Sequence, residues 1–102
     1  MYIAMLGKFN KWIQKEQIKI ENWGYKIEIS QFPANTDNPE GYKMDLESED
    51  YIARITFFDS GKCQLEIINV TSEETILFEY LQLNQNENLS KAFKNFLNTL
   101  QK

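Results

Sequence analysis

Carboxylates are the most concentrated reactive groups in this sequence, and four of them fall close together: Asp45, Glu47, Glu49 and Asp50. Paired carboxylates perform acid–base catalysis only where burial keeps one of them protonated by raising its pKa. The alternation of a β-strand leaves most of these side chains in solvent. Calcium binding is disfavoured too, because the stretch lacks the regular ligand spacing and the glycine of an EF-hand loop. We therefore expect a solvated acidic surface, to which neighbouring strands or turns add Glu28, Asp59 and Glu66.

Other catalytic chemistry is limited by the residue types that are missing. The 102 residues include no histidine, so Ser-His-Asp, Cys-His and Cys/His zinc sites cannot be built. The one cysteine, Cys63, cannot form an internal disulfide and is expected to be a small core or edge residue in a reducing compartment. The glycines are isolated from one another and form no phosphate-binding loop. The sequence therefore predicts a protein that is not an enzyme and uses no cofactor or metal.

Composition favours a single packed domain over residues 1–102. Hydrophobic residues make up 42% and aromatic residues 14%, which is enough for a core without disulfide or metal support. The net charge of −4 disfavours binding to nucleic acid or to an anionic membrane and favours a basic protein partner. Neither a signal peptide nor a membrane helix is recognisable, so a cytoplasmic location is expected.

The element expected to position the acidic groups is a sheet centred on a hairpin at 51–70. Both arms are rich in β-branched and aromatic residues, and Asp59, Ser60, Gly61 and Lys62 supply the turn, in which Gly61 can take a positive φ. Strands are predicted at about 25–32, 42–48, 51–58, 63–70 and 76–83. The 33–41 segment holds both prolines and is the longest loop, for which a binding role and a flexible connection are both open.

Helices are predicted at each end of the chain. Apolar residues spaced as on one helix side indicate a helix over about 3–22, which Gly24 would end. A second helix is predicted over about 86–101, with Asn84 and Asn86 as candidate caps. The fold class is therefore α+β, a two-layer sandwich in which both helices cover one face of an antiparallel five-stranded meander. The predicted core is Leu6, Phe9, Ile13, Ile27, Ile29, Met44, Leu46, Ile55, Phe57, Leu65, Ile67, Phe93, Phe96 and Leu97.

The other sheet face carries more large apolar side chains than a solvated face needs. Ile52, Phe58 and Ile68 alternate with Arg54 and several carboxylates. In a protein complex such apolar groups would be buried, while the charges around them match the partner. The predicted partner-binding residues are Asp45, Glu47, Ile52, Arg54, Phe58, Glu66 and Ile68.

Four segments also resemble a known family: a helix containing KW, the turn NWGYKIEI, the hairpin RITFFDSGKCQLEII and the final LSKAFKNFLNTL. Together they are similar to the TriTu family of bacterial immunity proteins. The resemblance implies a small cytoplasmic antidote that binds a cognate toxin domain of an Rhs-type secreted effector. We further expect the effector to be delivered by type VI secretion and the free antidote to be a monomer. The resemblance also implies that this toxin is an ADP-ribosyltransferase that uses NAD to modify elongation factor Tu, and that the antidote covers the toxin's active-site cleft.

Three other functions stay open on the sequence alone. An effector chaperone or adaptor would also bind a secreted protein, but without inhibiting it. An enzyme of an unrecognised kind is disfavoured by the missing histidine and phosphate loop. A nucleic-acid mimic is disfavoured because lysines interrupt the acidic rows.

Overall fold

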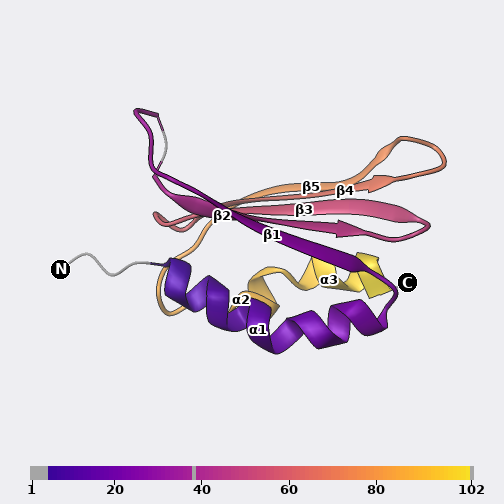
Figure 1. The fold of residues 1–102 in the computed structure, drawn as a ribbon, viewed down its shortest axis with the longest axis horizontal. Coiled ribbons are helices and arrows are strands. Elements are labelled where there is room, and N and C mark those ends of the chain that lie inside the picture. Colours follow the sequence, from indigo (N-terminus) through magenta and orange to yellow (C-terminus); the bar gives the residue numbers. More distant parts are fainter. Residues whose placement is uncertain (1–4, 38, 102) are drawn as a thin grey trace.

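The computed structural model describes residues 5–37 and 39–101 and contains two layers, a sheet and a set of helices on one of its faces (Figure 1). The sheet has five strands in the order β1-β2-β3-β4-β5, and every neighbouring pair is antiparallel. The predicted α+β meander is therefore confirmed. In chain order the elements are α1 (Leu6–Asn22), β1 (Lys26–Phe32), β2 (Gly41–Glu47), β3 (Tyr51–Phe58), β4 (Lys62–Asn69), β5 (Thr75–Gln82), α2 (Leu89–Ala92) and α3 (Lys94–Gln101).

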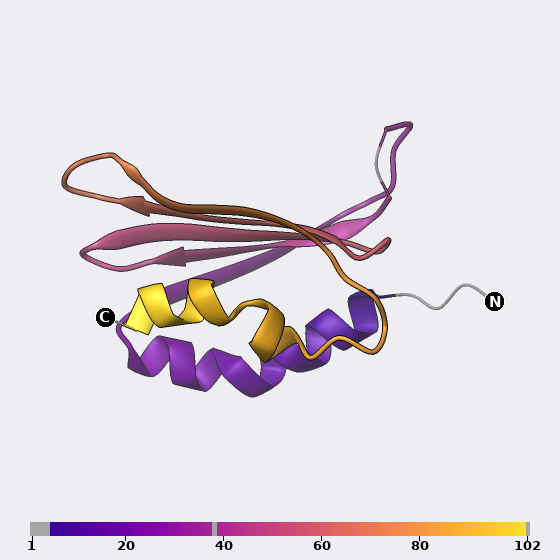
Figure 2. The same ribbon diagram turned by 180° about the vertical axis from the view of Figure 1, so that it is seen from behind.

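The core lies between the two layers and is centred on the middle strands. Met44, Ile55 and Leu65 are register partners on β2, β3 and β4, and all three are fully buried under the helices. From the helix side, the Phe9 ring of α1 stacks on Phe57 of β3 with ring centroids 4.4 Å apart. Trp12 meets Phe93 edge to face at 5.1 Å, which joins α1 to the C-terminal segment. Figure 2 shows α1 side by side with α2 and α3 beneath the sheet.

Two turns behave as their residues predict. Gly24 follows α1 with a φ of 101°, and Gly61 lies in the β3–β4 turn with a φ of 91°, conformations that glycine adopts without steric cost. The same turn also explains where α1 begins. Asp59 is buried and accepts a hydrogen bond from the Leu6 N–H at 3.2 Å, so a carboxylate stands at the helix N-terminus although Met5, at the N-cap position, makes no side-chain cap.

The bounds of both predicted helices differ from the observed ones. The first begins at Leu6; of its predicted residues, 3 and 4 lie outside the part of the chain that the structure describes. In place of the second predicted helix there are two, α2 and α3, and the first of them begins at Leu89. Its N-cap is Asn88, and neither Asn84 nor Asn86: the Asn88 side chain accepts a hydrogen bond from the Lys91 N–H at 3.0 Å. The Asn84 side chain instead accepts from the Asn86 N–H in a loop.

The break between α2 and α3 falls at Phe93, whose backbone leaves the helical region at φ −96° and ψ 17°. The prediction of one continuous C-terminal helix was therefore wrong. Phe93, at the break, and Phe96, in α3, are both fully buried. The short α2 packs against α1, and α3 contacts β4.

The predicted core is buried with three differences. Ile29 is 38% exposed, so its assignment to the core was wrong, and Ile27 and Leu97 are only partly buried. The cause is the edge strand β1, which lies near the helices where it begins and leaves them as the sheet twists (Figure 1). At the near end the Tyr25 hydroxyl donates a hydrogen bond to the Leu100 carbonyl at 2.8 Å. Further buried residues include Trp12, Ile20, Tyr25, Leu83, Leu89 and Leu100.

Truncation of a fully buried residue should destabilise the protein strongly. Ile55→Ala or Phe96→Ala leaves a cavity between the layers, so we expect each to lower the free energy of unfolding by about 2 to 5 kcal/mol. Ile18→Ala is the matched control, since this α1 side chain is 69% exposed, and it should change stability by less than about 0.5 kcal/mol. Urea denaturation followed by circular dichroism measures all three. Equal midpoints would contradict the assigned core.

The Cys63 thiol gives a pH-dependent test of the same core. Burial raises its pKa from the ordinary 9.0 to about 12. The unfolded thiol therefore ionises at lower pH than the folded one, so the stability that the neutral thiol contributes is complete below pH 9.0 and is lost as pH rises toward about 12. We expect the urea midpoint to fall between pH about 8 and about 10 more steeply than in Cys63→Ala, in which all other groups still titrate. Identical slopes in the two proteins would contradict a buried thiol.

Candidate partner-binding face

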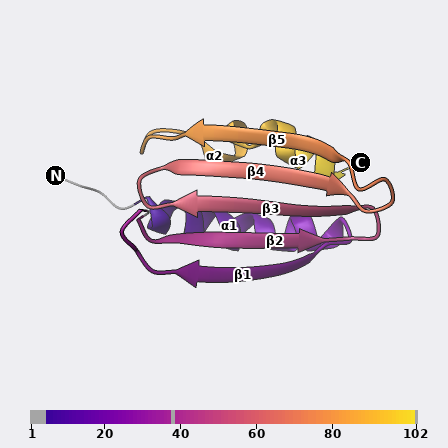
Figure 3. The same cartoon turned by 90° about the horizontal axis from the view of Figure 1, so that it is seen from above.

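None of residues 5–37 and 39–101 forms a layer over the sheet face opposite the helices (Figure 1), and we call this the open face. Figure 3 shows it from above, with the helices behind the strands. Strand register places all seven predicted partner-binding residues on it. Glu47, Ile52 and Ile68 are opposite one another on β2, β3 and β4, and Asp45, Arg54 and Glu66 form the next row. Phe58 follows at the end of β3.

Arg54 is at the centre of a row of opposite charges. Its Nε donates a hydrogen bond to Oδ1 of Asp45 at 2.6 Å, Glu66 flanks it on β4, and Glu28 is opposite Asp45 on β1. The hydrogen bond to Asp45, with further attraction from Asp45 and Glu66, raises the pKa of Arg54. Because Arg54 and Asp45 are both exposed for much of their surface, the pair adds at most about 1 kcal/mol to stability. Its larger effect is to hold a guanidinium and its carboxylates in fixed positions on an accessible surface.

Apolar groups lie on both sides of this charged row, next to it on one side and beyond the polar row of Lys43, Thr56 and Gln64 on the other. On one side Ile52 is 48% exposed beside the partly buried Ile68. On the other side Phe58 meets Phe32 edge to face at 5.5 Å. The Phe32 ring also covers Gly41, its register partner, so closely that a Cβ atom at position 41 would collide with it. Aromatic side chains and arginine, which this face exposes together, are residue types enriched in protein-binding surfaces.

The sequence-based site omitted the aromatic residues of β5. Phe78 and Tyr80 are register partners of Glu66 and Gln64, which places both on the open face, with exposed fractions of 46% and 71%. Their rings meet edge to face at 5.1 Å. Ile76, at a β-bulge opposite Ile67 and Ile68, is also exposed. The alternation of Ile76, Phe78 and Tyr80 is the signal that could have identified them.

The described residues of the open face line a hollow near each of two opposite corners. One has a volume of about 430 Å³ and is lined by residues that include Phe58, Lys62, Gln64, Tyr80 and Gln82. The other has a volume of about 520 Å³ and is lined by residues that include Lys26, Glu28, Asp45, Glu47 and Ile52. The first is therefore aromatic with a lysine, and the second is mainly acidic.

Catalytic groups are not assembled at either hollow. Cys63 borders the first, but its sulfur belongs to the core and its raised pKa keeps it a neutral thiol. Among residues 5–37 and 39–101, no three carboxylate or thiol groups are placed to hold a metal ion. Over the same residues, no helix has the length and apolar character that crossing a membrane requires.

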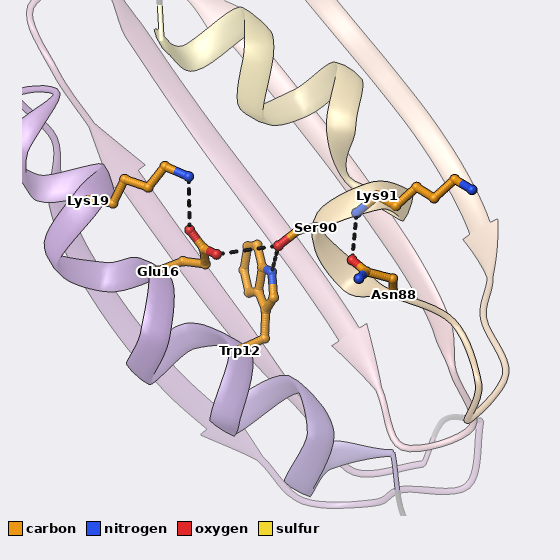
Figure 4. A network of polar contacts seen from close by, with 6 residues as sticks. All are labelled: Trp12, Glu16, Lys19, Asn88, Ser90 and Lys91. Carbon is orange, nitrogen blue, oxygen red and sulfur yellow. Dashed lines mark hydrogen bonds and ion pairs between the residues drawn. The ribbon is translucent and has the colours of Figure 1, made fainter.

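A polar network on the other side of the molecule is structural (Figure 4). The Trp12 indole N–H donates to the Ser90 hydroxyl at 3.0 Å, and this hydroxyl donates to the Glu16 carboxylate at 3.3 Å. Lys19 pairs with the other Glu16 oxygen at 3.5 Å. The network joins α1 to α2 and gives the buried Glu16 its partners, which a charged group in a core requires.

Comparison with known proteins identifies the chain. No curated protein matches it. A family model described as immunity protein TriTu matches residues 7–99. This range runs from the first turn of α1 to the last turn of α3 and includes every strand of the open face. The chain therefore belongs to the TriTu family of immunity proteins.

Proposed function

We propose that this protein neutralises a cognate toxin by binding it with the open face, and that it does so by obstruction, without catalysis of its own. The observation that carries the proposal is the uncovered sheet face on which Ile52 and the Arg54 row are exposed together. Membership of an immunity protein family supports a toxin as the partner. The buried thiol and the lack of histidine support a role that needs no catalytic group.

The open face is large enough for such a complex. With about 4.8 Å between strands and about 3.4 Å per residue, five strands of seven or eight residues present a surface of roughly 20 by 24 Å. Side-chain relief and the adjoining turns increase this area toward the about 800 Å² that each partner buries in a standard protein interface. One face is therefore sufficient to cover the mouth of an active site.

The toxin that we propose is the ADP-ribosyltransferase domain of an Rhs-type effector that is delivered by type VI secretion and modifies elongation factor Tu. Its active-site cleft must admit NAD and the target protein. A rigid sheet seated over that cleft would exclude both. The antidote would act in the cytoplasm, as a monomer that meets the toxin on entry. The resemblance in the four sequence segments supports this specific assignment.

Production of the toxin domain directly in the cytoplasm tests neutralisation. Cells that also make this protein should grow, and their elongation factor Tu should carry no ADP-ribose when probed with labelled NAD. A chaperone or adaptor gives no protection in this assay, because it does not inhibit the toxin. If the toxin labels a different protein in cells that lack the antidote, and the antidote still protects cells, then the proposed target is wrong and the proposed neutralisation is supported.

Binding should depend on the open face and leave the fold unchanged. We expect Ile52→Ala and Arg54→Ala each to weaken toxin binding by about 2 kcal/mol or more, because central apolar and arginine side chains dominate interface energies. Both residues are exposed, so the melting temperature should change by only a few degrees. Titration calorimetry with the purified toxin domain measures the affinity.

The matched controls are Ile18→Ala and Lys11→Ala, two exposed positions on α1 on the other side of the molecule. Both controls should bind as tightly as the unaltered protein. Unchanged affinity for the two open-face variants would overturn this model and direct attention to the 33–41 loop.

A further inference from the structure

Charge on the open face is divided between its two ends. The half next to the β2–β3 and β4–β5 turns, which we call the acidic end, carries Glu28, Asp45, Glu47 and Glu66 against Lys26 and Arg54. The exposed turn residues Glu49, Asp50, Glu73 and Glu74 extend it. The other half, the lysine end, carries Lys43 and Lys62, and among the described strand positions facing this side it has no carboxylate; the loop beside it adds the exposed Asp37 and Glu40, against four carboxylates in the turns of the acidic end. Along the direction of the strands, the open face therefore changes from net negative charge at one end to net positive charge on the strand positions of the other.

Aromatic side chains gather at the lysine end. Phe32, Phe58 and Tyr80 come from β1, β3 and β5, and the Lys43 ammonium lies 5.9 Å from the centre of the Phe32 ring. Between Phe58 and Tyr80 is the hollow of about 430 Å³, with Lys62 among its lining residues. Tyr80, the most exposed large apolar side chain of the described residues, forms part of its wall. A concave apolar site with one cation suits an apolar group that has an acidic neighbour.

We propose that this hollow is the anchor site of the toxin interface, and that it receives an aromatic or large aliphatic toxin side chain adjacent to a carboxylate that pairs with Lys62. The acidic end then faces a basic cluster on the toxin. This inference rests on the proposed function and specifies the chemistry of the partner. Apolar anchors seated in pockets supply most of the affinity of an interface, while charge complementarity fixes the orientation. A toxin surface with its charges divided in this way can dock in one direction only.

A second copy of this chain fits the open face less well than a toxin with the charges described above. Two copies stacked in opposite directions would bring an acidic end against a lysine end. Each copy, however, carries a net charge of −4, and the acidic end with its turns has many more charges than the lysine end. Together with Lys26 and Arg54, the two lysines of the facing copy offset only four of the eight carboxylates of the acidic end and its turns, so self-association is opposed by repulsion.

Two variants test the anchor site against the toxin domain from which the unaltered protein protects cells. We expect Tyr80→Ala and Lys62→Glu each to weaken binding by about 30-fold or more in calorimetry. Tyr80→Phe and Lys62→Arg, which keep the ring and the charge, should bind within a few fold of the unaltered protein. Lys11→Glu on α1 controls for the change in net charge. Circular dichroism and melting curves verify that each variant is folded.

A charge exchange makes the test specific to the proposed pair. Toxin domains with single Asp→Lys or Glu→Lys changes are screened for restored binding to the Lys62→Glu variant. We expect one such change to restore binding, at a carboxylate beside an aromatic or large aliphatic residue. Restored binding at no position would overturn the proposed pairing.

The remaining outcomes are distinct. If Tyr80→Ala and Lys62→Glu bind normally while Ile52→Ala does not, the anchor site is wrong and the proposed function stands. If the unaltered protein forms no complex with the toxin, the proposed function and this inference both fail. If the unaltered protein is a dimer in sedimentation and Lys62→Glu dissociates it, the occupant is a second copy and the inference is overturned.

Discussion

The contact on which the rest of the structure depends is the stacking of Phe9 on Phe57, with ring centroids 4.4 Å apart and ring planes within 8° of parallel. It joins the first helix to the central strand, and both rings are fully buried. With α1 held there, Trp12 reaches Phe93 and Ser90, and the C-terminal helices complete the same layer. Because the two helical segments pack against each other, both cover the same face of the sheet. The open face is thus a consequence of how the core is formed.

The two faces of the sheet consequently differ in how freely their side chains can be substituted. On the helix side, Met44, Ile55 and Leu65 are fixed by close packing, so a change in volume is felt throughout the core. On the open side, Arg54 and Asp45 are fixed by one hydrogen bond, and the side chains around them can change without loss of the fold. Such a division allows the specificity of an immunity protein to vary while its architecture is maintained.

Strand pairing could be predicted from the sequence because short turns connect alternating segments, which leaves antiparallel neighbours as the natural arrangement. The predicted strands therefore end within one residue of the observed ones. The helix ends were less predictable, because Asp59 from a distant turn serves the start of α1 and because the backbone at Phe93 leaves the helical region. Ile29 has the right alternation for the core. Its exposure depends on the twist of an edge strand, which cannot be predicted from the alternation of apolar and polar residues in that strand.

Seven open-face residues could be predicted because their strands alternate clearly, whereas β5 conceals its part of the face. Its helix side includes Glu79, opposite Leu65, while Phe78 and Tyr80 face outward, the reverse of the usual order. The bulge between Ile67 and Ile68 shifts the register as well. A charged residue on the core side and aromatic residues on the exposed side make the facing of β5 ambiguous until β4 is placed beside it.

The contacts between α1 and the C-terminal segment have a consequence for the synthesis of the protein. Lys8 bonds to Gln85, Trp12 to Ser90 and Tyr25 to Leu100, pairs separated by 75 to 78 positions in the chain. The helix layer therefore cannot close until nearly the whole chain has left the ribosome, and ribosomes halted midway release no folded protein. If the toxin modifies elongation factor Tu, as proposed, and translation stops, protection must come from molecules completed before the attack. Under the proposed function, a cell is protected only by antidote that is already folded when the toxin enters, since it cannot make more after translation has stopped.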